Sequence, residues 1–247
     1  MLDNITSVIQ MEDADIYKIK MYLHNQSKDD IYISRSIPVF TEDAEARLFL
    51  KCIFDLFERK YEGTFSQVRS LFHFVNANIS GDALVNIFSD DKLLRSTMRS
   101  ICIVDGDKQA QHKLENYTIA LPGDKSPEEL VFEYAEELYV NDDDFWIDST
   151  IVRLGFTKIY FRDHVLVDIN GIDEKINALK KNEESTKGIK RESNKKVFNK
   201  YRRFFETVMR KWIDDNEQKV KYFYHNLHIL FCKVSEFHDI NSKEWIE

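Results

Sequence analysis

Residues 100–111 read SICIVDGDKQAQ, and this stretch decides the fold. The apolar run Ile101–Val104 predicts a buried strand, which ends directly in Asp105-Gly106-Asp107. Side chains alternate along a strand, so we expect Asp105 and Asp107 to project to the same side. Neighbouring carboxylates repel unless a cation or a hydrogen-bond donor lies between them. The stretch therefore predicts either a divalent-metal site or an Asp- and Gly-rich turn.

Strands and helices alternate on both sides of this stretch. Helical spacing of apolar residues predicts a helix that begins at Thr41 or Glu42, another after Gly81, and a third capped by Ser126 with Pro127 at its first position. Predicted strands precede these helices, at 37–40, 71–77, 100–104 and 117–121. Such alternation is typical of an α/β fold, with a parallel sheet flanked by helices.

The two ends of the chain have different patterns. Alternating residues at 16–25 and 29–36 predict an N-terminal β-hairpin, whereas the pattern after about residue 140 is helical. The last helices are expected at 196–213 and 216–236. We therefore expect three parts: an N-terminal β segment that docks a partner (1–36), a catalytic α/β domain (37–140) and a helical C-terminal extension (141–247).

Composition indicates a folded protein of the reducing cytoplasm. The chain has 247 residues, of which 43% are hydrophobic, enough for a sizeable core. Its three cysteines lie singly in apolar segments without metal-ligand spacing, as core residues do. No signal peptide and no apolar run of about 18 residues is found, so we expect a soluble, cytoplasmic chain.

One basic segment stands out from an acidic chain of formal net charge −8. Residues 180–203 contain 10 lysines and arginines against 3 acids. The segment is either a solvated linker or a surface that neutralises phosphates. The candidate nucleic-acid-binding residues are Lys190, Arg191, Lys195, Lys196, Lys200, Arg202 and Arg203.

Acidic residues follow three of the predicted strands. In parallel sheets, functional side chains gather at the carboxyl ends of the strands. Glu42 follows the first strand, Asp105 and Asp107 follow the third, and Glu128 and Glu129 begin the helix after the fourth. A metal site would explain all of these acids together, whereas ordinary surface positions would need a separate explanation for each carboxylate.

The same residues resemble the Toprim fold, which topoisomerases, bacterial primases, recombination proteins and OLD nucleases share. The pattern consists of Glu42, then Ser80-Gly81, then Asp105-Gly106-Asp107. The resemblance is strongest to the Toprim domains of the OLD family, which accompany ABC/AAA-like ATPases in phage defence. It lies in the segments PVFTEDAEARLFL, ICIVDGD and ALPGDKSPEELVFEY. The resemblance covers roughly residues 37–138.

The resemblance implies a metal-dependent nuclease that cleaves DNA or RNA. It implies that Glu42, Asp105 and Asp107 bind Mg²⁺ or Mn²⁺, with Glu42 also placed as general base. A second ion about 4 Å away would be held by Glu128 or, next, by Glu129. A lysine would offset charge on the scissile phosphate, with Lys200 and Lys196 as candidates.

Two departures from the family pattern shape the expectations about partners. Asp43 stands where OLD proteins usually have glycine, and the chain contains no Walker A sequence. We therefore expect an ATPase on a partner subunit or on a fused half, and an oligomeric complex. The N-terminal strands are the favoured docking surface, ahead of the aromatic faces of the terminal helices. The alternative is a catalytically silent scaffold or sensor that keeps the acids for a structural metal.

Other polar clusters have simpler interpretations. The stretch NDDDFW at 141–146 is expected to cap a helix with an acidic first turn rather than to bind a cation. His225 and His228 lie one helical turn apart without a third zinc ligand, so we expect them on a helix surface.

Overall fold

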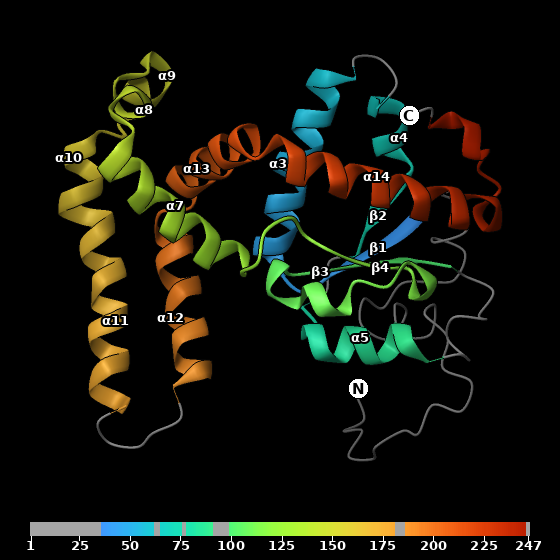
Figure 1. The fold of residues 1–247 in the computed structure, drawn as a ribbon, viewed down its shortest axis with the longest axis horizontal. Helices are drawn as coiled ribbons and strands as arrows, with labels where there is room; N and C mark the ends of the chain where they lie inside the picture. The colour runs from blue at the N-terminus through green and yellow to red at the C-terminus, as the bar shows by residue number, and fades with distance from the viewer. Residues whose placement is uncertain (1–35, 62–64, 76–77, 91–98, 181–185, 246–247) are drawn as a thin grey trace, which may run out of the picture.

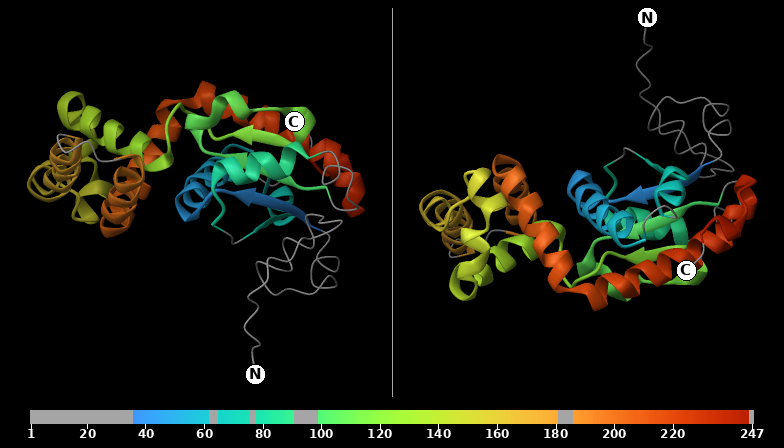
Figure 2. Two further views of the ribbon diagram at one scale, coloured as in Figure 1. Left: turned by 90° about the horizontal axis from the view of Figure 1, so that it is seen from below. Right: turned by 90° about the horizontal axis from the view of Figure 1, so that it is seen from above.

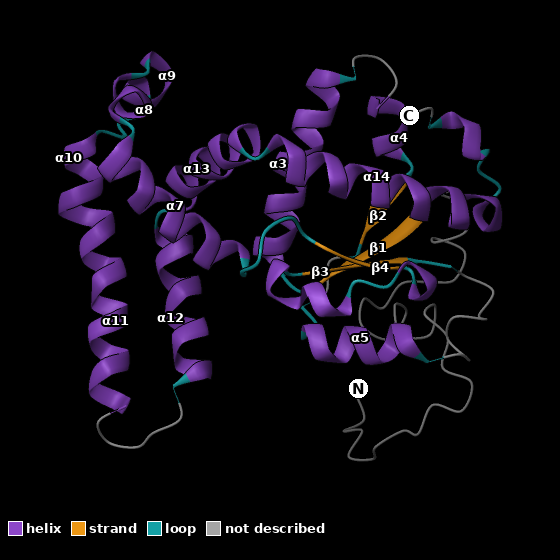
Figure 3. Ribbon diagram, viewed as in Figure 1, coloured by secondary structure: helices purple, strands orange, loops and turns teal. Residues whose placement is uncertain are grey.

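The sheet is four-stranded and entirely parallel. The structure is a computed structural model, and it describes residues 36–61, 65–75, 78–90, 99–180 and 186–245. The strands are β1 (Ile37–Thr41), β2 (Phe72–Phe74), β3 (Ile101–Val104) and β4 (Thr118–Ala120), in the order β2-β1-β3-β4 (Figure 3). Val39 pairs with Ile101, and Ile103 pairs with Ile119. The carboxyl ends of β1 and β3 are therefore neighbours, as the site prediction requires.

Helices cover both faces of the sheet, because its strands are apolar on both sides. Helix α5 (Gly81–Ser89) lies on one face, and α3 (Ala44–Lys60) and α14 (Glu217–Val234) lie on the other (Figure 1). Alternation within each strand sorts the side chains. Phe40, Cys102 and Val104 pack with Leu84 and Phe88 of α5. The opposite face joins the larger core, through Ile37, Val39, Ile101, Ile103 and Ile119.

The helical extension forms an arm beside the sheet and then returns across it. Helix α7 (Pro127–Asn141) leads to the short helices α8 (Asp143–Ile147), α9 (Ser149–Arg153) and α10 (Lys158–Tyr160). After a π-helical turn at Phe161–Val165, α11 (Leu166–Lys180) lies against α12 (Lys187–Lys200). Helix α13 (Arg202–Asp215) then packs on α3 and α7, and α14 crosses the sheet (Figures 1 and 2).

One buried core joins the sheet to this extension. Phe205 of α13 packs against Phe132 of α7, with ring centroids 4.8 Å apart. Trp245, near the end of the described chain, packs edge-on against Phe65 and Phe72 at 5.5 and 6.0 Å. Three additional short helical segments, α4 (Phe65–Ser70), Ser235–His238 and Ser242–Glu244, complete this end. The expected domain boundary between residues 140 and 141 stays a prediction.

The α/β prediction is confirmed, and so are several local ones. Ser126 caps α7 by accepting a hydrogen bond from the amide of Glu129, with Pro127 in the first turn. Asp142 caps α8 by accepting from the amide of Phe145, as expected for NDDDFW. The break between the last two helices falls at Asn216. The predicted N-terminal hairpin lies outside the described residues, apart from Ser36.

The expected helix at 196–213 is wrong. The chain forms α12 and α13 instead, with a break at Tyr201, whose hydroxyl donates to Asp168 of α11 at 2.8 Å. This turn stacks Phe198 of α12 on Phe205 of α13, with ring centroids 5.5 Å apart. The described part of the basic segment is therefore a packed helix and not a linker. Within the described residues, no helix is both long and apolar enough to cross a membrane.

Candidate metal centre

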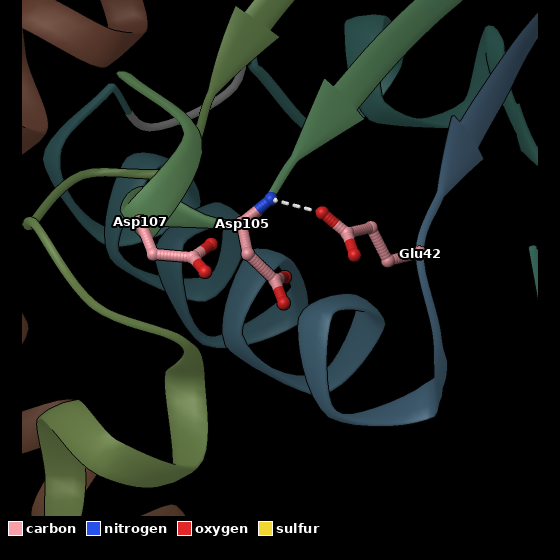
Figure 4. A group of neighbouring side chains, drawn as sticks. All are labelled: Glu42, Asp105 and Asp107. Carbon is pink, nitrogen blue, oxygen red and sulfur yellow. Dashed lines mark hydrogen bonds between the residues drawn. The ribbon is translucent and has the colours of Figure 1, made fainter. Parts of the chain in front are cut away.

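Three carboxylates meet at the carboxyl ends of β1 and β3. Glu42, Asp105 and Asp107 each offer one oxygen, and these oxygens all lie within 4.8 Å of one another (Figure 4). We call them the first carboxylate group. Glu42 directly follows β1, and Asp105 directly follows β3. The parallel pairing of these two strands brings together residues that are 63 positions apart in the sequence.

The two aspartates come together by a different local geometry from the expected one. Strand β3 ends at Val104, and a 3₁₀ helix, η1, runs from Gly106 to Gln111. Asp105 occupies the N-cap position of this helix, with φ −63° and ψ 158°, and Asp107 lies in its first turn. The proximity therefore results from a helical turn and not from strand alternation. Asp105 is 3% exposed, whereas Asp107 faces solvent.

Two backbone amides hold the carboxylate of Glu42. The amide of Gly81, at the start of α5, donates to Oε2 at 3.0 Å, and the amide of Asp105 donates to Oε1 at 3.1 Å (Figure 4). A β-carbon at residue 81 would collide with the Glu42 carboxylate and with the side chain of Lys108. Glycine at this position therefore permits the close approach that fixes Glu42.

Asp105 presents a buried oxygen without a hydrogen-bond partner among the described residues. Its Oδ1 atom is inaccessible to solvent and unbonded. Burial raises the pKa of Asp105 well above its usual range, and the charges of Glu42 and Asp43 raise it further. Such an orphaned buried oxygen is costly unless a ligand satisfies it. A hard divalent cation prefers carboxylate oxygens, so the donors present fit Mg²⁺ or Mn²⁺.

A second carboxylate group lies beside the first and is formed by Asp43, Glu45 and Glu128. All three are buried, and their oxygens also lie within 4.8 Å of one another. Helix α12 supplies their partners: the Lys195 ammonium lies 2.5 Å from Asp43, and the Asn199 amide donates a hydrogen bond to Glu45 at 2.8 Å. The two groups together could bind metal ions.

Charge and burial pull the pKa values of the second group in opposite directions. Burial alone would raise the pKa of Asp43, but hydrogen bonds from Lys195 and from the amide of Ala46 hold it below its usual value. Burial raises the pKa of Glu128 to about 7, and the charge of Asp43 adds to this. The pKa of Glu128 therefore lies closer to neutral pH than that of Asp43.

A cavity of about 390 Å³ opens onto the first carboxylate group. Cationic side chains from two elements line it, Lys108 from η1 and Lys190 and Arg191 from α12. Each of these cations also pairs with an acid: Lys108 with Asp82 at 2.6 Å, Lys190 with Glu129 at 2.8 Å, and Arg191 with Glu42 at 3.3 Å. The cavity thus combines a carboxylate floor with a basic rim. Its remaining lining residues are Asp105, Asp107, Ser126, Glu128, Gly188 and Asn194.

Several predicted residues lie elsewhere. Glu129 belongs to neither carboxylate group, because its carboxylate pairs with Lys190 on the rim. Lys200, the predicted catalytic lysine, pairs with Asp168 at 2.5 Å and lies outside the cavity lining. Lys196 also lies outside it, pairs with Glu192 on the same helix and is 74% exposed. Arg202 and Arg203, in the first turn of α13, are exposed and equally absent from the lining.

Sequence reasoning missed Asp43 and Glu45 as site residues. In the sequence, Asp43 is only a departure from the family pattern. In the structure it caps α3 by accepting a hydrogen bond from the amide of Ala46 at 3.0 Å. A signal was present in the four-residue spacing of Arg191, Lys195 and Asn199, which places three polar side chains on one helix face. A helix face with two cations and an amide is expected to pack against acidic residues.

The geometry of this site carries the functional argument. Comparisons of the chain with known protein families, with curated proteins and with solved structures find no match.

Proposed function

We propose that this chain is a nuclease dependent on Mg²⁺ or Mn²⁺, of the OLD-type Toprim kind, that cleaves phosphodiester bonds in DNA or RNA. The observation that carries the proposal is the buried, unpartnered Oδ1 of Asp105 beside Glu42 and Asp107. Carboxylates placed at the carboxyl ends of adjacent parallel strands occupy the position where α/β folds keep their active sites. A divalent ion held there would supply a Lewis acid that polarises a phosphoryl oxygen.

The residues of the chain have separate roles in the proposed reaction. The two amides on Glu42 fix the direction of its carboxylate before any ligand arrives. Such preorganisation lowers the cost of reaching the reactive geometry. Asp107 is exposed, so it can meet both the cation and the solvent from which the attacking water comes. In the proposal Glu42 also serves as the general base.

The basic rim supports a phosphate-bearing substrate. Lys108, Lys190 and Arg191 surround the carboxylate floor from two sides. A substrate phosphate would exchange with the acids that now pair with Lys108 and Lys190, because those pairs are partly exposed and therefore weak. Lys108 and Lys190, which line the cavity, take the place of Lys200 as the candidate lysines for the scissile phosphate.

Control by an ABC/AAA-like ATPase, as the effector of a phage-defence complex, belongs to the same proposal and rests on the resemblance described above. The second candidate is a catalytically silent scaffold. It takes support from the second carboxylate group, which Lys195 and Asn199 already satisfy.

A cleavage assay separates these candidates. The purified chain is incubated with plasmid DNA, single-stranded DNA and tRNA, each with Mg²⁺, Mn²⁺ or EDTA. We expect metal-dependent cleavage of at least one substrate, lost in Asp105→Asn and Asp107→Asn. The matched control is Asp173→Asn, which removes an exposed carboxylate on α11. Absence of cleavage of all three substrates, or equal cleavage by Asp105→Asn, would contradict the nuclease.

A further inference from the structure

The two carboxylate groups have similar composition but different partners. Each consists of three acids whose oxygens lie within 4.8 Å. In the first group, Asp105 has a buried oxygen that no described residue bonds. In the second group, each oxygen of Asp43 and Glu45 lies near a donor or a cation. The second group therefore has a cation in contact with its carboxylates, whereas Oδ1 of Asp105 in the first group has no partner among the described residues.

Lys195 is the cation of the second group. Its ammonium lies 2.5 Å from Oδ2 of Asp43 and 3.8 Å from Oε2 of Glu45. The other oxygen of Asp43 accepts the amide of Ala46, and the other oxygen of Glu45 accepts Asn199. A divalent ion bound to these carboxylates would have to displace the ammonium or lie in contact with it, and like charges at that distance repel.

Buried residues of α12 on either side of Lys195 fix the position of its ammonium. Phe198 of α12 is fully buried and stacks on Phe205, and Asn194 on the same helix is also buried. Lys195 lies between these two anchors in the sequence and is only 29% exposed. Arg191, one turn earlier, bridges the groups at 3.3 Å from Glu42 and 3.6 Å from Asp43.

We propose that the chain binds a single divalent ion, at Glu42, Asp105 and Asp107, and that the Lys195 ammonium permanently occupies the place a second ion would take. The inference rests on the metal-binding part of the proposed function and replaces the expected pair of ions. Glu128 is then a buried neighbour of the lysine and not a metal ligand.

The test counts ions on the intact chain with Mn²⁺ alone as the probe. Equilibrium dialysis gives the number bound, and electron paramagnetic resonance distinguishes an isolated ion from a spin-coupled pair. We expect one isolated Mn²⁺ per wild-type chain, none in Asp105→Asn, and two coupled ions in Lys195→Met. The control Lys196→Met removes the neighbouring, exposed charge and should retain one ion.

A second variant keeps the inference testable if Lys195→Met does not fold. Asp43→Asn changes an acid of the second group and leaves all three ligands of the first in place, so it should leave the Mn²⁺ number and affinity within threefold of wild type. Two ions on the wild type, a single ion on folded Lys195→Met, or a tenfold loss of affinity in Asp43→Asn would each overturn the inference.

The same samples separate this inference from the proposed function. Two ions together with cleavage would overturn the single-ion centre and leave the nuclease intact. One ion without cleavage of any substrate would support the single-ion centre and contradict the nuclease. A wild-type chain that binds no Mn²⁺ would overturn both.

Discussion

The backbone amide of Asp105 donates a hydrogen bond to Oε1 of Glu42 at 3.1 Å, and this bond joins the ends of β1 and β3 (Figure 4). The carboxylate of Glu42 is thus held by the backbone of Asp105. The Asp105 carboxylate itself has a buried oxygen without a hydrogen-bond partner among the described residues. The site therefore costs stability in the absence of a cation.

Asp105→Asn is expected to stabilise the metal-free chain. An asparagine amide can donate to the neighbouring carboxylates, whereas the aspartate repels them. At pH 8 in EDTA, we expect the free energy of unfolding to rise by about 1 to 3 kcal/mol. Wild type should gain about 2.7 kcal/mol from Mg²⁺ at 100 times its dissociation constant, and the variant should gain nothing. Urea unfolding with and without Mg²⁺ measures both.

Asp107→Asn is the matched comparison for this prediction. Asp107 is exposed, so its replacement should change the metal-free stability by less than about 0.5 kcal/mol. It should still reduce the stabilisation by Mg²⁺, because it removes a ligand. If Asp105→Asn lowers the metal-free stability and still responds fully to Mg²⁺, the acids form a structural turn and not a metal centre.

Glu128 should make the metal-free chain less stable as the pH rises. Burial raises its pKa from 4.5 to about 7, so the folded chain holds this proton more tightly than the unfolded chain. Stability from Glu128 is then fully present below about pH 4.5 and is lost between about pH 4.5 and 7. Glu128→Gln should match wild type near pH 4.5 and exceed it at pH 8 by up to about 3 kcal/mol, at about 1.4 kcal/mol per pKa unit.

Urea unfolding at intervals between pH 4.5 and 8 tests the prediction for Glu128. Glu129→Gln is the control, because Glu129 lies on the rim and pairs with Lys190. Glu129→Gln should not exceed wild type in stability at pH 8, because it removes an ion pair on the rim. A difference for Glu128→Gln that is independent of pH would mean that the pKa of Glu128 is the same in the folded and the unfolded chain.

The sequence predicted the sheet and the first carboxylate group because both depend on local patterns. An apolar run ending in acids places Glu42 and Asp105 at strand ends, and parallel pairing then brings them together. Of the second group only Glu128 was predicted; Asp43 and Glu45 were not, because their place in the site depends on α12, which docks 152 residues later in the chain. Net charge identified the basic segment but not which lysine faces inward. Burial of Phe198 decides that, and burial depends on the tertiary packing.

Gly81→Ala is expected to lower metal affinity, although Gly81 is not itself a proposed ligand. A β-carbon there would collide with the Glu42 carboxylate, so the hydrogen bond from the amide of residue 81 should be lost. We expect Mn²⁺ affinity to fall at least about tenfold and the free energy of unfolding to fall by about 1 to 3 kcal/mol. Titration calorimetry and urea unfolding measure the two effects.

Gly171→Ala is the control for this substitution. Gly171 lies in α11, where a β-carbon would meet nothing within 4 Å. Alanine should leave Mn²⁺ affinity unchanged and raise stability by up to about 1 kcal/mol, through its higher helix propensity. If both variants bind Mn²⁺ like wild type, the contact between residue 81 and Glu42 does not position the site.

Lys190 and Lys196 provide a test of where nucleic acid lies on α12. Both pair with an acid, Lys190 with Glu129 at 2.8 Å and Lys196 with Glu192 at 2.7 Å, but only Lys190 lines the cavity. Binding of an oligonucleotide is measured by fluorescence anisotropy at several salt concentrations, in the Asp105→Asn background to prevent cleavage. Lys190→Gln should weaken binding and reduce the slope of log K against log salt by about 0.9 for duplex DNA or about 0.7 for a single strand. Lys196→Gln should change neither, and the reverse result would place the substrate on the outer face of α12, away from the carboxylates.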